Sequence, residues 1–122
     1  MTRTITAHKV NPVNDLITIE VMDTPGPGGA NHFYNLEWPV AFGTEAIDIP
    51  FQCGPIQESG VNGVTHEALL AVVADRLKSF QAGPYACREN SLALTKIEEA
   101  MHWMHHRTIT RMQRGVEGTS SV

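Results

Sequence analysis

The first 50 residues alternate between apolar and polar positions in short runs, which is the pattern of β-strands with one buried face. Residues 3–10 and 15–22 are rich in Thr, Ile and Val, the residue types that strands prefer. Turn-forming residues at 11–14 separate these two runs, so we predict an antiparallel hairpin. Two more strands are expected over residues 32–38 and 45–49. Residues that interrupt strands lie beside them: Pro39, Gly43 and Pro50.

The segment between the second and third expected strands, residues 23–30 (DTPGPGGA), is too rich in Gly and Pro for a regular element. Glycine-rich loops hold phosphate groups when they lead directly into a helix. Here an extended aromatic stretch follows the loop. A mobile flap or a wide strand connection is therefore favoured, and a phosphate cradle is the alternative.

The second half of the chain carries apolar residues at helical spacing in two stretches. The first stretch is expected over residues 65–80, where Thr65 can cap the start and Gly83-Pro84 must follow the end. The second is expected over about 91–114, with Asn90 or Ser91 as its N-cap. A helical hairpin follows from this order. The sequence Phe-Gln-x-Gly-Pro occurs at both 51–55 and 80–84, and each copy is typical of a turn.

These elements predict an α+β fold, in which an N-terminal antiparallel β-sheet is followed by a C-terminal two-helix hairpin. A chain of 122 residues fits a single domain. Within it we expect a β-rich part over 1–50, a connecting loop over 51–64, the hairpin over 65–115 and a flexible tail over 116–122.

Composition narrows the classes of protein. Hydrophobic content of 42% with 18% charged residues is typical of a soluble globular chain, and no apolar run approaches the roughly 20 residues that cross a bilayer. The first residues lack an apolar signal region, so we expect a cytosolic location, in which Cys53 and Cys87 stay thiols. The net charge of -4 argues against polymeric nucleic acid, although Arg107, Arg111 and Arg114 gather without an acidic residue over 100–114.

The turn between the two expected helices gathers residue types suited to a planar, anionic ligand. It holds two aromatic residues, a cation and an amide: Phe80, Tyr85, Arg88 and Asn90. Aromatic rings stack on bases, Arg binds phosphate, and an amide can contact a base edge or a ribose. The alternative is structural, with both rings closing the base of the hairpin and Asn90 serving only as a cap.

Other chemistry is not indicated. His102, His105 and His106 have spacings found in zinc-binding helices, but no acidic residue lies between them and no third ligand is evident, so we predict no metal site. There is no G-x-S-x-G sequence and no Cys with a nearby base, so we assign no catalytic residue and expect no cofactor.

The sequence FQAGPYACRENSLALTKIEEAMHW, followed by RTITRMQRGVEGT, resembles a hairpin shared by two groups of bacteriophage immune-evasion proteins. These groups are the Thoeris anti-defence sponges and the anti-CBASS sponges. The preceding FQCGPIQESGVNGVTHEALL is also similar, so the resemblance covers about residues 51–118. The β-rich residues 1–50 look more like the Thoeris branch.

The resemblance implies binding without catalysis. Such proteins sequester, intact, the cyclic ADP-ribose isomer (glycocyclic ADP-ribose) that a TIR-domain enzyme makes from NAD in the cytoplasm of the infected bacterium. It also implies a homo-oligomer, with dimers assembling to a hexamer and ligand at chain interfaces, and a second site for cyclic trinucleotides of CBASS defence.

By position, the resemblance implies roles for five residues. Phe80 would be the base-stacking platform, Asn90 a polar contact, and Arg107 and Arg111 phosphate contacts. Arg88 would serve the cyclic-trinucleotide site. Candidates from the β-rich part are Phe33, Tyr34 and Asn35.

Two rival functions belong to different classes. A phosphodiesterase would cleave the same signals and release products of altered mass. A basic helical hairpin that docks on host protein or RNA would bind no small molecule, and its binding would fall steeply with salt.

Overall fold

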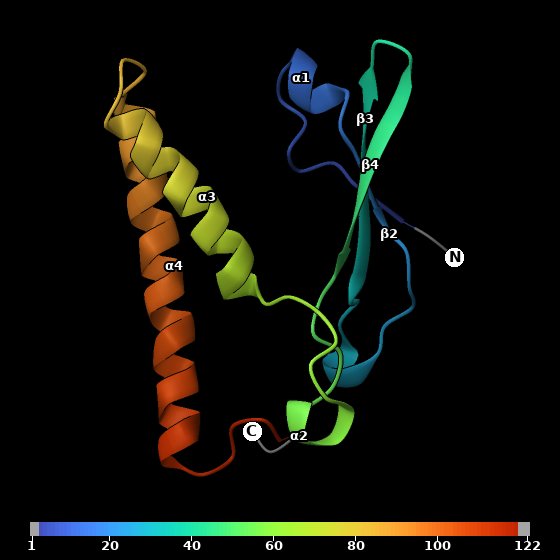
Figure 1. Cartoon of the computed structure of the whole chain (residues 1–122), viewed down its shortest axis with the longest axis vertical. Coiled ribbons are helices and arrows are strands. Elements are labelled where there is room, and N and C mark those ends of the chain that lie inside the picture. Colours follow the sequence, from blue (N-terminus) through green and yellow to red (C-terminus); the bar gives the residue numbers. More distant parts are fainter. Residues whose placement is uncertain (1–2, 120–122) are drawn as a thin grey trace. The chain divides into compact units, whose positions relative to one another are not determined.

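The computed structural model of the chain describes residues 3–119, and the chain divides into two compact units, Met1–Val64 and Thr65–Val122. The first unit holds an antiparallel sheet and the second a pair of long helices (Figure 1). The α+β fold class predicted from the sequence is confirmed, whereas the single-domain organisation stays a prediction. Within residues 3–119, no helix combines the length and apolar content needed to cross a membrane.

The sheet has four strands in the order in which they occur along the chain, and each pairs with the next in antiparallel fashion. The strands are β1 (Arg3–Ile5), β2 (Thr18–Val21), β3 (Phe33–Val40) and β4 (Gly43–Pro50). The predicted pairing of the first two strands is confirmed, but a short helix α1 (Pro12–Asp15) stands where a simple turn was expected. Asn11 starts α1 because its side chain accepts the N–H of Asn14 at 3.2 Å, and Pro12 is suited to a first helical position.

Strands β3 and β4 run further than predicted, because β3 continues through Pro39 to Val40. Proline interrupts a strand where its missing N–H is needed by a neighbour. The register of β2 against β3 ends at Thr18 with Glu37, so β3 beyond Glu37 has only β4 as a partner. Pro39 is therefore tolerated on the unpaired side of the strand.

The glycine-rich loop connects β2 to β3, and hydrogen bonds hold its two ends together. A short 3-10 helix, η1 (Pro27–Gly29), lies within it. The Asp23 carboxylate accepts the backbone N–H groups of His32 at 2.9 Å and Phe33 at 3.3 Å. The bond from the His32 N–H is the main reason that the pKa of Asp23 lies below its usual value. A carboxylate thus occupies the amides that follow the loop, which favours a strand connection over a phosphate cradle.

The two copies of Phe-Gln-x-Gly-Pro share a structural device that the sequence did not reveal. In the first copy, the Gln52 amide donates to the carbonyls of Gly54 and Gly60 and accepts the N–H of Asn62. These bonds brace the loop around helix α2 (Ile56–Ser59). In the second copy, the Gln81 amide both donates to and accepts from the backbone of Cys87, at 3.0 Å each. Each glutamine therefore closes the loop that its own Gly-Pro begins.

Gly63 allows the two ends of the first braced loop to approach closely. The backbone of Val64 pairs with that of Phe51, and a Cβ at Gly63 would lie 2.5 Å from the carbonyl carbon of Phe51 and the carbonyl oxygen of Pro50. We expect Gly63→Ala to destabilise the protein by roughly 1–3 kcal/mol, seen as a lower denaturant midpoint. Gly83→Ala is the matched control, because its Cβ would be 3.5 Å from the nearest atom. Equal midpoints for the two variants would contradict the steric argument.

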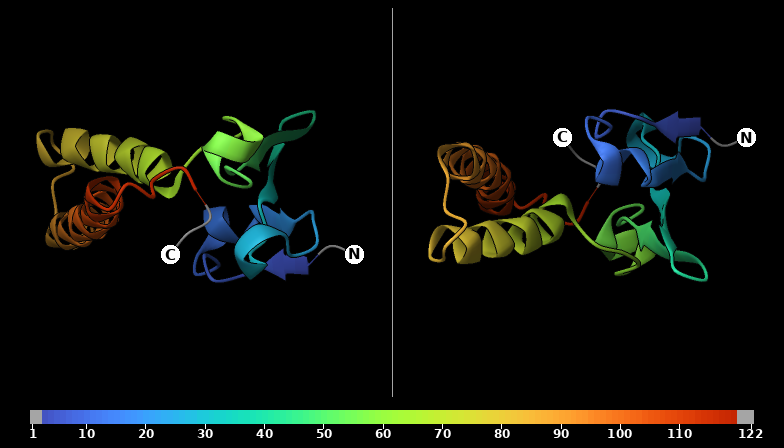
Figure 2. Two further views of the ribbon diagram at one scale, coloured as in Figure 1. Left: turned by 90° about the horizontal axis from the view of Figure 1, so that it is seen from below. Right: turned by 90° about the horizontal axis from the view of Figure 1, so that it is seen from above.

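The helical hairpin consists of α3 (His66–Gln81) and α4 (Arg88–Gln113), which lie side by side in all views (Figures 1 and 2). Thr65 caps α3 as predicted, since its hydroxyl accepts the N–H of Ala68 at 3.1 Å. The predicted start of α4 is wrong by three residues, because Cys87 rather than Asn90 or Ser91 is the N-cap. With 26 residues against 16, α4 continues about 15 Å beyond the length that α3 can cover. We call this part, residues 104–113, the α4 extension.

Candidate ligand-binding site

A cavity of about 480 Å³ opens at the turn of the hairpin, and we call it the tip pocket. Its lining comes from the last turns of α3 and from the connecting turn: Asp75, Arg76, Ser79, Phe80, Gly83, Pro84 and Tyr85. The rings of Phe80 and Tyr85 face each other edge on, with centroids 6.4 Å apart. Phe80 is half-buried, while Tyr85 is 74% exposed. Tyr85 therefore does not close the base of the hairpin, and the tip pocket offers aromatic surface to a ligand.

Arg76 belongs to the tip pocket, although it is not among the site residues predicted from the sequence. Its guanidinium carbon lies 5.1 Å from the centroid of the Phe80 ring. The two residues are four apart on α3, and residues at this spacing are neighbours on a helix surface. That spacing was the signal in the sequence that could have identified Arg76.

Asn90 and Arg88 lie in the first turn of α4, next to the tip pocket in sequence but not among its lining residues. The Cys87 sulfur accepts the backbone N–H of Asn90 at 3.5 Å, so Asn90 is not the cap. Its side-chain amide has no hydrogen-bond partner within the described chain, and Arg88 is exposed. Both side chains are therefore available to a ligand.

Arg107 and Arg111 lie together on the α4 extension. With His106, Thr110 and Arg114 they line a separate cavity of about 310 Å³, which we call the basic pocket. Arg107 is exposed, and it makes no ion pair or hydrogen bond with any residue of 3–119. This part of the site is electropositive and open.

Arg111 differs from Arg107 because it is only 6% exposed. Its guanidinium donates to the carbonyls of Val116 at 2.9 Å and Thr119 at 3.0 Å, and lies 3.6 Å from the Glu117 carboxylate. Composition predicted a flexible tail over 116–122, but residues 116–119 are held in a turn by these bonds. The rest of that tail, residues 120–122, lies outside the described residues. Arg111 therefore has a structural role as well as a position in the basic pocket.

The structure does not bring all the predicted site residues together within one chain. Asn90 and Arg107 are 17 residues apart on the same helix, which corresponds to about 26 Å along its axis. That span is most of the diameter of a small domain. One small nucleotide cannot reach both positions on the same copy of α4.

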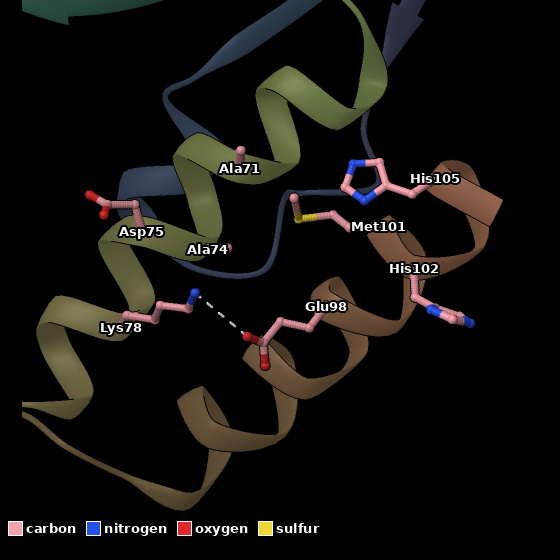
Figure 3. A pocket seen from close by; sticks show the side chains of 8 residues that line it. All are labelled: Ala71, Ala74, Asp75, Lys78, Glu98, Met101, His102 and His105. Carbon is pink, nitrogen blue, oxygen red and sulfur yellow. Dashed lines mark ion pairs between the residues drawn. The ribbon is translucent and has the colours of Figure 1, made fainter. Parts of the chain in front are cut away.

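A third cavity, also of about 480 Å³, lies between the middle parts of α3 and α4 (Figure 3). Lys78 crosses it to pair with Glu98 at 3.7 Å, and small residues, Ala71 and Ala74, form its α3 side. His105 points toward α3, whereas His102 points away from it. None of the predicted site residues lines this cavity, and the carboxylates of Asp75 and Glu98 make it less suited to an anion than the basic pocket.

The histidines of α4 do not gather with other metal-binding groups. The rings of His102 and His106 stack with centroids 6.4 Å apart, and each meets the exposed Trp103 edge on. Over residues 3–119, no three or more His, Cys, Asp or Glu side chains are arranged to hold a metal ion. Both Cys53 and Cys87 are free thiols.

The candidates from the β-rich part take part in the sheet unit. The ring of Tyr34 packs edge on against Phe51 at 5.5 Å, and the Asn35 amide donates to the Asp48 carboxylate at 2.8 Å. Phe33 pairs with Pro50 at the end of β4. All three belong to β3 and are half-buried.

The fold is thus that of a small α+β protein whose helical hairpin carries an aromatic pocket at its turn and a basic pocket on its longer helix. The sequence profile of the "Acb2/Tad1, hairpin domain" family matches residues 43–108. The chain belongs to this family. The match runs from β4 into the α4 extension, so it includes the whole tip pocket and Arg107.

A homologue named "Thoeris anti-defense 1", from Bacillus phage SBSphiJ7, is 50% identical over 78 residues. The aligned segment is 64% of this chain and 55% of the relative, so the chain spans about half the length of the relative that it matches.

Proposed function

We propose that the protein binds and sequesters, without degrading it, a cyclic ADP-ribose isomer (glycocyclic ADP-ribose) made by a TIR-domain enzyme of Thoeris defence. It acts in the cytoplasm of the infected bacterium, where that signal is made. The observation that carries the proposal is the open aromatic tip pocket, which lies within the segment that matches the family. The name of the relative, Thoeris anti-defense 1, points to the same defence system.

The chemistry of the tip fits a nucleotide. Phe80 offers a ring on which an adenine can stack, a contact worth about 1–3 kcal/mol per base. Asn90 can exchange hydrogen bonds with a base edge or a ribose, because its amide has no partner within the described chain. The tip pocket is lined by one cation and one carboxylate, Arg76 and Asp75, so its net charge is zero and further phosphate contacts are expected from elsewhere.

The basic pocket supplies this charge from a second copy of the chain. Arg107 and Arg111 lie about 26 Å and about 32 Å along α4 from Asn90 at the tip of their own hairpin, so they can meet its ligand only from a partner chain. In a two-fold dimer each site would combine the tip of one hairpin with the α4 extension of the other. The site we propose is therefore composite and repeats twice per dimer.

Burial in the single chain favours such an assembly. Within the described hairpin, Ala74 is the one apolar residue that is fully buried, while large apolar side chains are exposed. Examples are Val72 at 68%, Trp103 at 64% and Met112 at 63%. Covering apolar surface contributes about 25 cal/mol per Å², so association of hairpins is favoured. We propose dimers that assemble further to a hexamer, which would bury more of this surface.

Capture of ligand tests the proposal directly. The purified protein is mixed with cyclic ADP-ribose isomers, unbound ligand is removed, the protein is denatured by heat, and the released material is identified by mass. We expect intact glycocyclic ADP-ribose. A phosphodiesterase would return a cleaved product. A protein that carries no small molecule, but binds RNA or a host protein with a steep salt dependence, would contradict a sponge.

Phe80→Ala should abolish capture while leaving the oligomer intact, because it removes the stacking surface without touching a buried group. Loss of one base stack corresponds to roughly 5- to 150-fold in affinity. Phe42→Ala is the matched control, since Phe42 is fully exposed at the β3–β4 turn. Isothermal titration with size-exclusion chromatography would check both variants. Unchanged affinity in Phe80→Ala would remove the tip pocket from the site.

A second ligand class is proposed for Arg88. We propose that this exposed cation, in the first turn of α4, contacts a cyclic trinucleotide of CBASS defence at a separate site. Positive ends of helices attract phosphate, and Arg88 adds a full charge there. Adding cyclic trinucleotides to the capture experiment tests this site, with Arg88→Ala expected to lose them and to keep the cyclic ADP-ribose isomer.

A further inference from the structure

Arg76 lies over the ring of Phe80 in the tip pocket, on a face of the ring where a base could stack. Its guanidinium carbon lies 5.1 Å from the centroid of Phe80, so it covers one face of that ring. Arg76 and Phe80 both line the same cavity of about 480 Å³. A ligand that stacks on this face of Phe80 must therefore displace or contact the guanidinium of Arg76.

The bonding groups of Arg76 are not used by the protein. Asp75, its neighbour in the pocket lining, forms no ion pair with it. The carboxylate of Glu98 pairs with Lys78 and not with Arg76. Over residues 3–119, the stacking contact with Phe80 is the interaction that Arg76 makes. Its five N–H donors and its outer planar face are therefore available to a ligand.

We propose that Arg76 is a specificity-determining residue that swings away from Phe80 as a base enters and then forms the second wall of the base site. The guanidinium must move because its present separation of 5.1 Å from the Phe80 centroid leaves no room for a base, and it is free to do so because Arg76 is exposed. This inference rests on the proposed function and adds to it the basis on which the ligand is chosen. A guanidinium is planar and stacks on aromatic faces, which the compact ammonium of Lys does not do. Arg76 therefore selects ligands with a flat, electron-rich base, such as a purine.

The charge of Arg76 extends this selection. Because a guanidinium carries a positive charge, a base that enters beside it is favoured when it carries phosphate nearby. Neutral nucleosides gain the stack but not this attraction. The tip pocket thus distinguishes purine nucleotides from both neutral nucleosides and phosphorylated sugars without a base.

Three substitutions separate stacking from simple charge. We expect Arg76→Ala to weaken binding of glycocyclic ADP-ribose about tenfold, and Arg76→Lys to weaken it nearly as much because charge alone does not replace the planar wall. Arg76→Tyr should recover part of the loss, since it restores a flat surface. Lys78→Ala is the matched control, a nearby cation on α3 that lies outside the tip pocket, and should bind like wild type.

Titration calorimetry gives the affinities. The decrease in the ultraviolet absorbance of adenine on binding reports the stacking of the base, and a purely structural role of Arg76 would leave this decrease unchanged. If wild type captures no nucleotide, the proposed function itself fails. If wild type binds and Arg76→Ala binds equally well, the inference about Arg76 is overturned while the sponge stands. Full recovery by Arg76→Lys would overturn the stacking wall and make Arg76 a phosphate contact.

Discussion

Mixing Phe80→Ala protein with Arg107→Ala protein should restore ligand capture that neither variant has alone. Each variant loses one half of the proposed composite site, the tip or the basic pocket. In a mixed two-fold dimer, one site combines both defects and the other combines the two intact halves. Random pairing of equal amounts makes half of the dimers mixed, so about a quarter of the wild-type sites should return. Co-refolding followed by the heat-release experiment would measure this fraction.

A second mixture controls for non-specific effects of refolding. Phe80→Ala and Asn90→Ala both alter the tip, so every site in their mixed dimer keeps one damaged tip, and no capture should return. The arrangement across two chains would be refuted if the first mixture also stayed empty while native mass spectrometry showed mixed dimers. It would also be refuted if the second mixture recovered capture as well as the first.

Arg111→Ala should destabilise the protein, whereas Arg107→Ala should not. Arg111 is 6% exposed and donates to the carbonyls of Val116 and Thr119, so its loss removes a charged donor from each carbonyl. The Val116 carbonyl keeps the backbone N–H of Thr119 as a donor. Hydrogen bonds from a charged group contribute roughly 1.5–3 kcal/mol. We expect Tm to fall by roughly 5–15 °C in Arg111→Ala. Arg107 makes no such bond within the described chain, so its removal should leave Tm unchanged while capture is lost.

Scanning calorimetry of both variants, at one protein concentration, tests this difference. The concentration must be matched because association shifts the apparent stability of an oligomer. Arg111→Lys is the conservative control: it keeps the charge but lacks the planar group that places Nη2 between two carbonyls and Nε beside Glu117, so an intermediate Tm is expected. Equal Tm values for Arg107→Ala and Arg111→Ala would mean that the turn over 116–119 does not depend on Arg111.

The elements of the fold could be predicted largely from local pattern, and the failures have physical causes. Thr65 caps α3 as expected, because a hydroxyl before an apolar stripe is a strong signal. The start of α4 was misplaced because Cys87 is a weak acceptor that sequence rules place below Asn and Ser. Pro39 suggested the end of a strand, but β3 continues through it. A proline is tolerated there because β2 stops before that point, which is a property of the whole sheet and not of the local sequence.

The candidate site was predictable in its residue types but not in its arrangement. The aromatic and amide groups of the tip are close in sequence, so their proximity in the hairpin was expected. The separation of Arg107 from Phe80 follows from the length of α4. The structural role of Arg111 depends on carbonyls that follow the helix, and no side-chain pattern marks these acceptors.

The α4 extension affects how the number of complete binding sites depends on the concentration of the protein. If the cations on this extension serve the tip of another chain, a folded but unassembled chain has no complete site. The number of sites then follows the concentration of dimers, which at low expression rises with the square of the protein concentration. Capture would therefore begin with a threshold in gene expression, and a variant that folds normally but assembles poorly would fail early in infection, when copies are few.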